Sequence, residues 1–379
     1  MRVEQARWTQ AAGWEPRRPG DLGPSAQLVL LFGATSILKS DQPLGEIKAL
    51  YPKAHLMGCS TAGEIFSTQV RDDSLVVTAI ELAHTTLSGA HASAKDAANS
   101  LQLGERLAKQ LDPKGLTHVF MLSEGLNVNG SELVKGLNAN LPANVTVTGG
   151  LSGDGSRFQE TLVLWDGPPA RDSIAAVGFY GSRLRVGYGS LGGWDAFGPE
   201  RLITRSRGNV LYELDGKSAL ELYKQYLGEH AKGLPATGLL FPLCLRTQQE
   251  QTGVVRTILG IDEGAKSMTF AGDVPEGAYA RLMKANFDRL IDGAVGAAKT
   301  SSQALGSGSP DLAILISCVG RKMVLKQRIE EEVEGVREVV GAKTVLTGFY
   351  SYGEISPFTP HAKCELHNQT MTITTFSEQ

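Results

Sequence analysis

Apolar runs alternate with helix-like patterns in three stretches of the chain, and all three stretches follow one plan. An apolar run is followed by a loop, a helical segment and a second apolar run that ends at a glycine turn. The stretches span residues 27–65, 117–155 and 311–355. A strand, a covering helix and another strand within about 35 residues have the size of a βαβ crossover. We therefore expect the two strands of each stretch to be parallel, with the glycine turns at their C-terminal ends.

The helical segment of the third stretch has the clearest periodicity. Leu325, Ile329, Val333, Val336 and Val340 recur at steps of three or four residues, which places them on one face of a helix. The charged residues between them fall on the other faces, so we expect this helix to cover a sheet. Ligand sites in such sheets favour the edge at which the parallel strands end.

Strand-like runs without helices lie between these stretches and are separated by short polar or glycine breaks, a pattern typical of a meander. They cover residues 74–82, 160–167, 173–181 and 184–191. Helical periodicity returns at residues 96–111, at residues 218–227, and at residues 275–300, where Met283, Phe287, Leu290 and Ala294 share a face. The predicted fold class is α+β, with duplicated mixed β-sheets, βαβ units and covering helices.

Turn-forming residues interrupt the strand series at 192–200, and we expect the main domain boundary there. The expected organisation is an N-terminal segment of residues 1–26, a first domain of residues 27–195 and a second domain of residues 196–379.

Composition narrows the class of protein. The net charge of the 379 residues is only -3 and the basic residues are scattered, so we expect no nucleic-acid partner. No apolar run approaches the length of a membrane span and the N-terminus has no signal-like apolar region, so we expect a cytoplasmic protein without membrane insertion. The four cysteines form no C-x-x-C pair and are expected to be reduced thiols.

Two glycine turns share the pattern Gly-x5-Glu-Ile, in GCSTAGEI at 58–65 and in GFYSYGEI at 348–355. A glycine after an apolar strand lets backbone N–H groups approach a ligand, since no Cβ stands in the way. Hydroxyl groups and a carboxylate follow in each turn, so we expect a pocket for a small polar ligand. The candidate ligand-binding residues are Cys59, Ser60, Thr61 and Glu64 in the first turn, and Tyr350, Ser351, Tyr352 and Glu354 in the second.

Three alternatives remain open for these turns. The first is that the two related turns bind against each other across a pseudo-twofold axis. The second is structural: both turns cap buried strands, and Glu64 and Glu354 accept backbone N–H bonds from neighbouring loops. The third is an enzyme that uses Cys59 or Glu64. Cys59 would need a nearby histidine as base, and His55 on the same predicted strand would lie about 13 Å away, too far for proton transfer. We therefore expect that the chain is not an enzyme.

A last motif, ELHNQTMTITTF at 365–376, combines a histidine with an alternating strand pattern. His367 either forms a structural hydrogen bond at the start of a strand or acts as an axial ligand of haem iron. His361, six residues earlier, is a second candidate for the metal. No C-x-x-C-H is present, so any haem would be bound without covalent bonds.

GCSTAGEI resembles the signature of the N-terminal FIST domain, and GFYSYGEI followed by ELHNQTMTIT resembles that of the C-terminal FIST domain. The family is named for F-box and intracellular signal transduction proteins, and the resemblance covers the chain from about Leu28 to Phe376. It implies a sensory, ligand-binding protein, with amino acids among the small molecules proposed as ligands. The chain is also similar to stand-alone bacterial haemoproteins that sense nitric oxide. That similarity implies haem as cofactor and a histidine kinase or a cyclic-di-GMP enzyme as partner.

Overall fold

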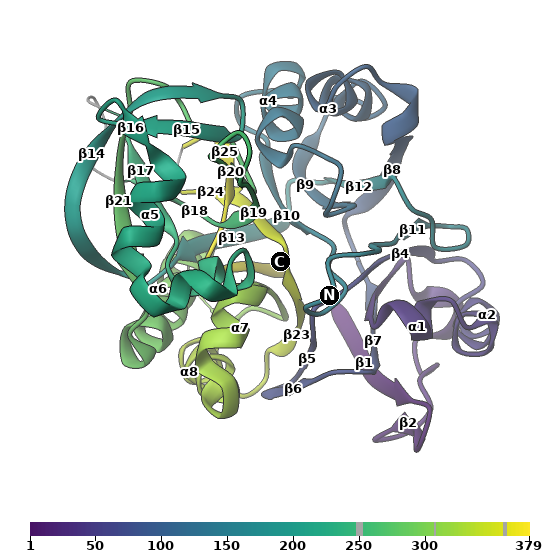
Figure 1. Ribbon diagram of the computed structural model, residues 1–379. Coiled ribbons are helices and arrows are strands. Elements are labelled where there is room, and N and C mark those ends of the chain that lie inside the picture. Colours follow the sequence, from purple (N-terminus) through teal and green to yellow (C-terminus); the bar gives the residue numbers. More distant parts are fainter. Residues whose placement is uncertain (248–252, 307, 359–361) are drawn as a thin grey trace.

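Three six-stranded sheets form the body of the protein in the computed structural model (Figure 1). The structure describes residues 1–247, 253–306, 308–358 and 362–379. The first sheet runs β11-β4-β3-β7-β1-β2 and consists of β1 (Arg2–Thr9), β2 (Gly13–Glu15), β3 (Leu28–Gly33), β4 (His55–Ser60), β7 (Leu75–Glu81) and β11 (Val163–Trp165). The second runs β25-β24-β10-β9-β12-β8 and consists of β8 (Thr86–Ser93), β9 (Leu116–Ser123), β10 (Thr146–Leu151), β12 (Ser173–Tyr180), β24 (Gly353–Pro357) and β25 (Cys364–His367). The third runs β13-β26-β22-β23-β5-β6 and consists of β5 (Glu64–Phe66), β6 (Gln69–Arg71), β13 (Leu184–Leu191), β22 (Leu312–Cys318), β23 (Val345–Ser351) and β26 (Met371–Glu378).

Helices accompany each of the three units. They are α1 (Thr35–Leu38) and α2 (Asp41–Leu50) in the first unit, α3 (Ser100–Ala108) and α4 (Gly130–Asn140) in the second, and α6 (Phe287–Leu305), α7 (Val319–Leu325) and α8 (Ile329–Val340) in the third. Asparagine side chains at positions 99, 129 and 286 cap the first turns of α3, α4 and α6 by accepting backbone N–H bonds. Short 3-10 turns occur at Gly23–Ser25, Ala94–Asp96, Gly228–Gly233, Ala236–Leu240 and Lys326–Arg328.

The predicted βαβ pairs are confirmed. β3 and β4, β9 and β10, and β22 and β23 are all parallel, and each second strand ends at its glycine turn. In α8 the predicted face is buried, with Val333, Val336 and Val340 in the core, although a break at Lys326 separates Leu325 in α7 from this helix. The mixed α+β class is confirmed, and the repeating unit occurs three times.

The three units exchange strands in a ring. The strand that follows each glycine turn leaves its own unit and pairs with the second parallel strand of another unit. Thus β5 of the first unit joins β23 of the third, β24 of the third joins β10 of the second, and β11 of the second joins β4 of the first. The expected domain ranges 27–195 and 196–379 consequently share strands.

The meander prediction is wrong. The strands of the four predicted runs lie in three different sheets, where β7 pairs with β1 and β3, β11 with β4, β12 with β8 and β9, and β13 with β26. The local alternation of apolar and polar residues fixes which face of a strand is buried. It does not fix the partner strand, because strand exchange and crossovers decide the pairing.

An inserted subdomain, residues 195–284, leaves the third unit after β13 and returns at α6 (Figure 1). Its eight-stranded sheet runs β18-β17-β21-β14-β15-β20-β19, with β16 paired to β15, and is accompanied by α5 (Ala219–Leu227). The strands are β14 (Asp195–Arg207), β15 (Val210–Leu214), β16 (Lys217–Ser218), β17 (Leu243–Arg246), β18 (Val254–Arg256), β19 (Ile258–Asp262), β20 (Ser267–Phe270) and β21 (Tyr279–Lys284).

The helix predicted over 275–300 is wrong in its first part. Residues Tyr279–Lys284 form β21, which pairs with both β14 and β17, and the helix begins only at Phe287. Ala280 and Leu282 alternate into the core of the subdomain, so pairing on two sides overrides the helical spacing of Met283 with Phe287.

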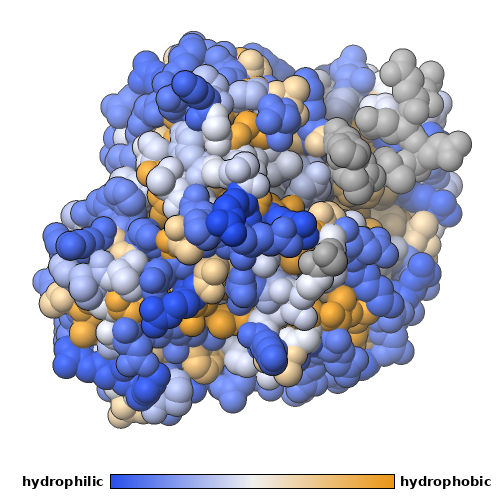
Figure 2. All heavy atoms as spheres, turned by 180° about the vertical axis from the view of Figure 1, so that it is seen from behind, coloured by the Kyte–Doolittle hydropathy of each residue, from blue (hydrophilic) through white to orange (hydrophobic). Residues whose placement is uncertain are grey.

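A central apolar core joins the units. It draws on all three, and the rings of Phe32 and Phe349, from the first and third units, lie 4.8 Å apart. Figure 2 shows one face of the exterior, where hydrophilic residues predominate and apolar residues appear in small separate groups. Within the part of the chain that the structure describes, no helix combines the length and the apolar character needed to cross a bilayer.

Candidate functional site

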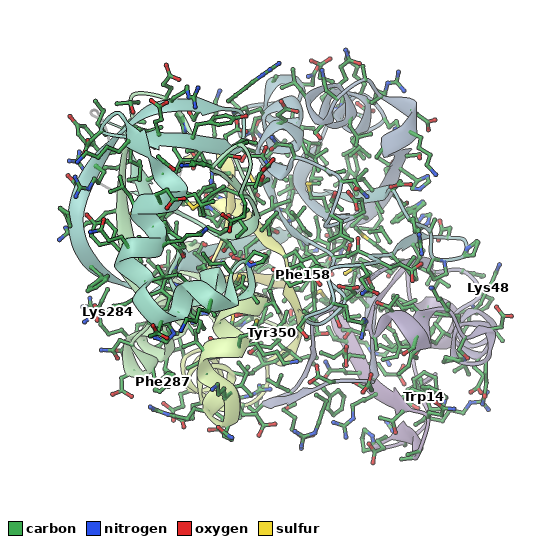
Figure 3. The ribbon with its side chains drawn as sticks, in the orientation of Figure 1. Trp14, Lys48, Phe158, Lys284, Phe287 and Tyr350 are labelled. Atoms are coloured by element: carbon green, nitrogen blue, oxygen red, sulfur yellow. The ribbon has the colours of Figure 1, made fainter. Side chains whose placement is uncertain are left out.

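The glycine turns meet at the centre of the molecule. The N–H of Ala62 donates to the carbonyl of Tyr350, and the N–H of Tyr350 donates to the carbonyl of Gly63, both at 2.8 Å. The turn at 149–155 completes the junction, because the N–H of Gly153 donates to the carbonyl of Ser60 at 2.9 Å. Tyr350 is fully buried, and Figure 3 labels it near the middle of the view. The structure therefore brings the two predicted turns together, with the third turn beside them.

The first glycine of each turn lies against its parallel neighbour strand. A Cβ atom on Gly58, Gly149 or Gly348 would lie 2.3, 1.9 or 1.8 Å from the carbonyl oxygen of Leu31, Met121 or Leu315, respectively. These glycines are needed for close packing of two strands within each unit. The repeated glycine is thereby explained without a ligand.

Glu64 and Glu354 are buried carboxyl groups with matching partners. Glu64 accepts hydrogen bonds from the hydroxyl of Thr61 at 2.5 Å and from the N–H of Ser74 at 3.1 Å. Glu354 accepts from the hydroxyl of Ser351 at 2.6 Å and from the N–H of Thr370 at 3.1 Å. Burial raises the pKa of Glu64 to about 7 and that of Glu354 to about 8. Each carboxyl group ties its turn to the start of a later strand, the geometry that the structural alternative expects.

The remaining candidate residues of the turns are also inside the protein. Cys59 is fully buried, and burial raises the pKa of its thiol well above the ordinary value, so it is not a thiolate. The hydroxyl of Ser60 accepts from the N–H of Leu162 at 2.8 Å. The hydroxyl of Tyr352 donates to Asp154 in the third turn. Of the candidates in the two turns, Thr61 and Glu64 border an open cavity of about 450 Å³.

Tyr350 enters a buried charged cluster that the sequence analysis missed. Its hydroxyl donates to Glu332 at 2.7 Å, and Glu332 pairs with Arg321 at 2.7 Å; both charged side chains are fully buried. Arg321 also donates to the carbonyls of Gly192 and Leu290, which flank the two connections of the inserted subdomain. The cluster therefore links the turn junction to the base of the subdomain.

Two of the described histidines, His367 and His118, do not fit an axial haem ligand. His367 is 1% exposed, and its Nε2–H donates to the carbonyl of Ser356 at 2.9 Å. Burial lowers its pKa to about 4, so the ring is neutral. His118 is buried between the hydroxyls of Thr146 and Thr148. In the described part of the chain, neither His367 nor His118 is among the residues that line the three larger cavities. The other candidate, His361, lies outside the described residues.

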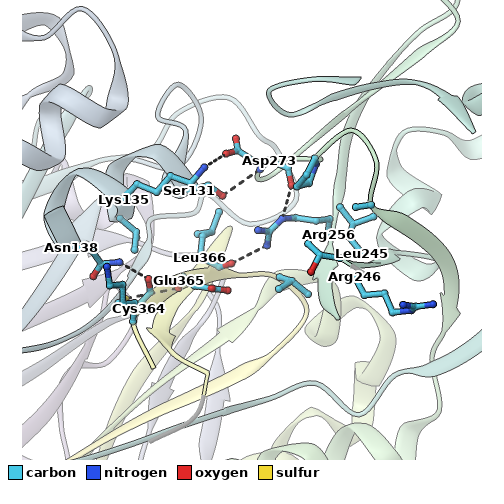
Figure 4. A pocket seen from close by; sticks show the side chains of 16 residues that line it. Ser131, Lys135, Asn138, Leu245, Arg246, Arg256, Asp273, Cys364, Glu365 and Leu366 are labelled. Carbon is cyan, nitrogen blue, oxygen red and sulfur yellow. Dashed lines mark hydrogen bonds and ion pairs between the residues drawn. The ribbon is translucent and has the colours of Figure 1, made fainter. Parts of the chain in front are cut away.

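A second cavity, of about 300 Å³, lies where α4, the inserted subdomain and β25 meet (Figure 4). We call it the Arg256 pocket. Its walls are largely apolar and include Val134, Leu245, Val254 and Leu366. Glu365 and Leu366, the first two residues of the ELHNQT motif, line this pocket together with Cys364 just before the motif. His367 of the same motif is not part of the lining.

Arg256 is the buried cation of this pocket. It is 8% exposed; its Nη1 donates to the carbonyl of Leu366 at 2.9 Å and its Nε to the carbonyl of Asp273 at 3.2 Å. The carboxylate of Asp273 instead accepts from Lys135 at 2.6 Å and from Asn129 at 3.0 Å. Among the described residues, no carboxylate lies within 4.0 Å of the Arg256 guanidinium and no hydrogen bond leaves its Nη2.

Burial of Arg256 disfavours its charged form. Burial lowers the pKa of Arg256 to about 10, although Glu365 and Asp273 at longer range favour the charged form. A buried cation without a carboxylate partner is costly, and an anionic ligand would relieve that cost. No sequence motif surrounds Arg256, and its position beside Leu366, 110 residues later, could come only from the tertiary structure.

Two protein-family models match the chain. A model of the FIST N domain matches residues 27–217, and a model of the FIST C domain matches residues 219–357. The chain belongs to the FIST family. FIST domains are associated with sensory signal transduction, and FIST sensor domains suggest binding of a small molecule.

One curated relative, an uncharacterized protein of Methanocaldococcus jannaschii, is 23% identical over 342 residues. This alignment includes 80% of the chain, and the chain spans 62% of the relative's length.

Solved structures that align with the chain include a cyanuric acid hydrolase from A. caulinodans, with TM-score 0.36 and coverage of 100% of this chain and 99% of that one. A chorismatase aligns with TM-score 0.35 and coverage of 99% and 98%. Both are 9% identical in sequence. These proteins are enzymes, so the prediction that the chain is not an enzyme is wrong as stated. At this TM-score and identity, the likeness assigns no reaction to the chain.

Proposed function

We propose that this FIST protein senses a small metabolite that carries a carboxylate, such as an amino acid, and that the Arg256 pocket is the binding site. The observation that carries the proposal is the buried guanidinium of Arg256, whose hydrogen-bond partners among the described residues are the carbonyls of Leu366 and Asp273, and which lines a largely apolar cavity. A ligand carboxylate would pair with this guanidinium, and an aliphatic side chain would lie against Leu245 and Val254. The cavity volume of about 300 Å³ suits a ligand of that size.

The pocket also offers a route for transmission. It lies between the inserted subdomain and the body, which are joined there by the contacts of Arg256 with Leu366 and of Asp273 with Lys135. A ligand that binds Arg256 competes with the carbonyl of Leu366 and changes the contact between the two parts. Differential affinity for two positions of the subdomain would convert occupancy into a surface change that a partner reads.

Titration calorimetry with single amino acids tests the site. We expect Arg256→Gln to weaken binding by about 30-fold or more, since loss of one partner of a buried charge pair costs 2–5 kcal/mol. Arg256→Lys keeps the charge without the planar fork and should fall between. Arg205→Gln, in the exposed ion pair of Arg205 with Glu213 on the same subdomain, is the control. Equal affinity of wild type and Arg256→Gln would disprove this site.

Three further points stay predictions: haem as cofactor, nitric oxide as ligand, and a histidine kinase or cyclic-di-GMP enzyme as partner. Their direct test is an absorption spectrum of the protein after expression with a haem supply. A Soret band that shifts with nitric oxide and disappears in His361→Ala would support the haem sensor. Protein that stays colourless after addition of hemin would rule it out.

A further inference from the structure

The Arg256 pocket has a counterpart in the first unit. On α4, the residues that line the Arg256 pocket are Ser131, Val134, Lys135 and Asn138. On α2, the residues that line a cavity of about 470 Å³ are Asp41, Leu44, Gly45 and Lys48. The spacing of i, i+3, i+4 and i+7 is the same on both helices, and both helices connect the parallel strands of their units. We call the second cavity the α2 groove.

The exchanged strands beside the two cavities also correspond. Leu164 of β11 lines the α2 groove and pairs with Gly58, the first glycine of its turn. Ile355 of β24 pairs with Gly149 in the same way, and its partner on β25, Leu366, lines the Arg256 pocket.

After each exchanged strand the chain turns back and runs antiparallel to it. In the sheet of the second unit, β25 pairs with β24 in this way. In the sheet of the first unit, Ala170 forms a single antiparallel bridge with Val163 of β11. The inserted subdomain covers only the Arg256 pocket, since it lies on the far side of the molecule from α2 (Figure 1).

The chemistry of the α2 groove is that of an amphipathic site. Its apolar lining consists of five leucines and two prolines: Leu31, Leu38, Leu44, Leu56, Leu164, Pro168 and Pro169. Of its charged residues, Lys39 pairs with Glu160 and Asp166 pairs with His55. Lys48 is exposed at the outer margin of the molecule (Figure 3) and makes no ion pair within the described residues.

Asp41 sets a limit on the ligand. It lies two turns before Lys48 on the same helix, about 10 Å away along the axis. A carboxylate is attracted by Lys48 at one end of the groove and repelled by Asp41 at the other. This arrangement favours a single carboxylate with an apolar tail over a dicarboxylate.

We propose that the α2 groove is a second ligand site, which binds an amphipathic monocarboxylate with its tail on the leucines and its carboxylate at Lys48. This site is independent of the Arg256 pocket, and either can exist without the other.

Octanoate is the probe. Titration calorimetry and methyl NMR of Leu44 and Leu56 should show saturable binding that octylamine does not reproduce. A Cβ on Gly45 would meet no atom within 4 Å, so a side chain can begin at this position of the groove lining without a clash. Gly45→Leu should fill the groove and reduce octanoate affinity at least tenfold, whereas Gly45→Ala should change it less than threefold. Lys48→Glu should also reduce affinity about tenfold.

Arg256→Gln separates the two sites, because binding reported by the Leu44 methyl groups should persist in that variant. The proposal is overturned if the Leu44 and Leu56 signals do not move, if Gly45→Leu binds octanoate like Gly45→Ala, or if octylamine binds as tightly as octanoate. Circular dichroism of Gly45→Leu confirms that the variant is folded before the comparison is made.

Discussion

At the scale of single residues, the buried carboxyl groups of the turns make stability depend on pH. Burial raises the pKa of Glu354 to about 8 in the folded protein, whereas an unfolded glutamate has a value near 4.5. Between these values the folded state holds a proton that the unfolded state releases. The free energy of unfolding contributed by Glu354 is therefore fully present below pH 4.5 and is lost as the pH rises toward 8. Glu64 acts in the same direction up to a pH of about 7.

The variant Glu354→Gln removes this titration. We expect the wild type to lose about 3 kcal/mol more stability than the variant between pH 5 and pH 8, because this window lies between the unfolded and folded pKa values of Glu354. Urea unfolding at both pH values measures the difference, with the exposed change Glu338→Gln as control. Identical pH dependence in wild type and Glu354→Gln would show that this carboxyl group does not titrate in the window.

At the scale of elements, the glycine that opens each turn allows two parallel strands to pack. The carbonyl of Leu315 would lie 1.8 Å from a Cβ on Gly348, a contact that backbone atoms cannot relieve by rotation. The same constraint applies to Gly58 and Gly149 in the other two units. A structural requirement repeated three times explains why the turns resemble one another.

Gly348→Ala should therefore destabilise the protein by about 1–3 kcal/mol or more, the usual cost of overpacking. Gly45→Ala is the matched control: it lies in the interior of a helix with open space around it, and should stabilise the protein by about 0.5–1 kcal/mol. Equilibrium unfolding in urea compares the two variants. A Gly348→Ala protein as stable as wild type would contradict the packing explanation.

At the scale of the whole molecule, the inserted subdomain is an addition to a body of three strand-exchanged units. Its two connections lie together, since Gly193 contacts the backbone of Arg289 and Asp195 pairs with Arg289 at 2.5 Å. The subdomain has its own apolar core around Leu211, Tyr223 and Phe270. Arg256, the residue on which ligand binding is proposed to depend, belongs to it.

Replacement of residues 195–284 by a short Gly-Ser linker should leave a body that unfolds cooperatively, because all three exchanged strands lie outside the deleted range. The variant should lose amino-acid binding and keep octanoate binding at the α2 groove. Circular dichroism, urea unfolding and calorimetry check these outcomes. Failure of the body to fold would show that the subdomain and the body form one cooperative unit.

The sequence by itself determined the local structure: three βαβ units with parallel strands, glycine turns at strand ends, and the buried face of α8. Apolar periodicity carries that information because it reports which side of an element is buried. The family followed from the motifs of the turns. Only the tertiary structure decided which strands pair. It exchanged β5, β11 and β24 between units, turned residues 279–284 into a strand, and buried the predicted ligand residues of the second turn. It also placed Arg256 beside Leu366, since contacts between residues 110 positions apart leave no periodic trace in either segment.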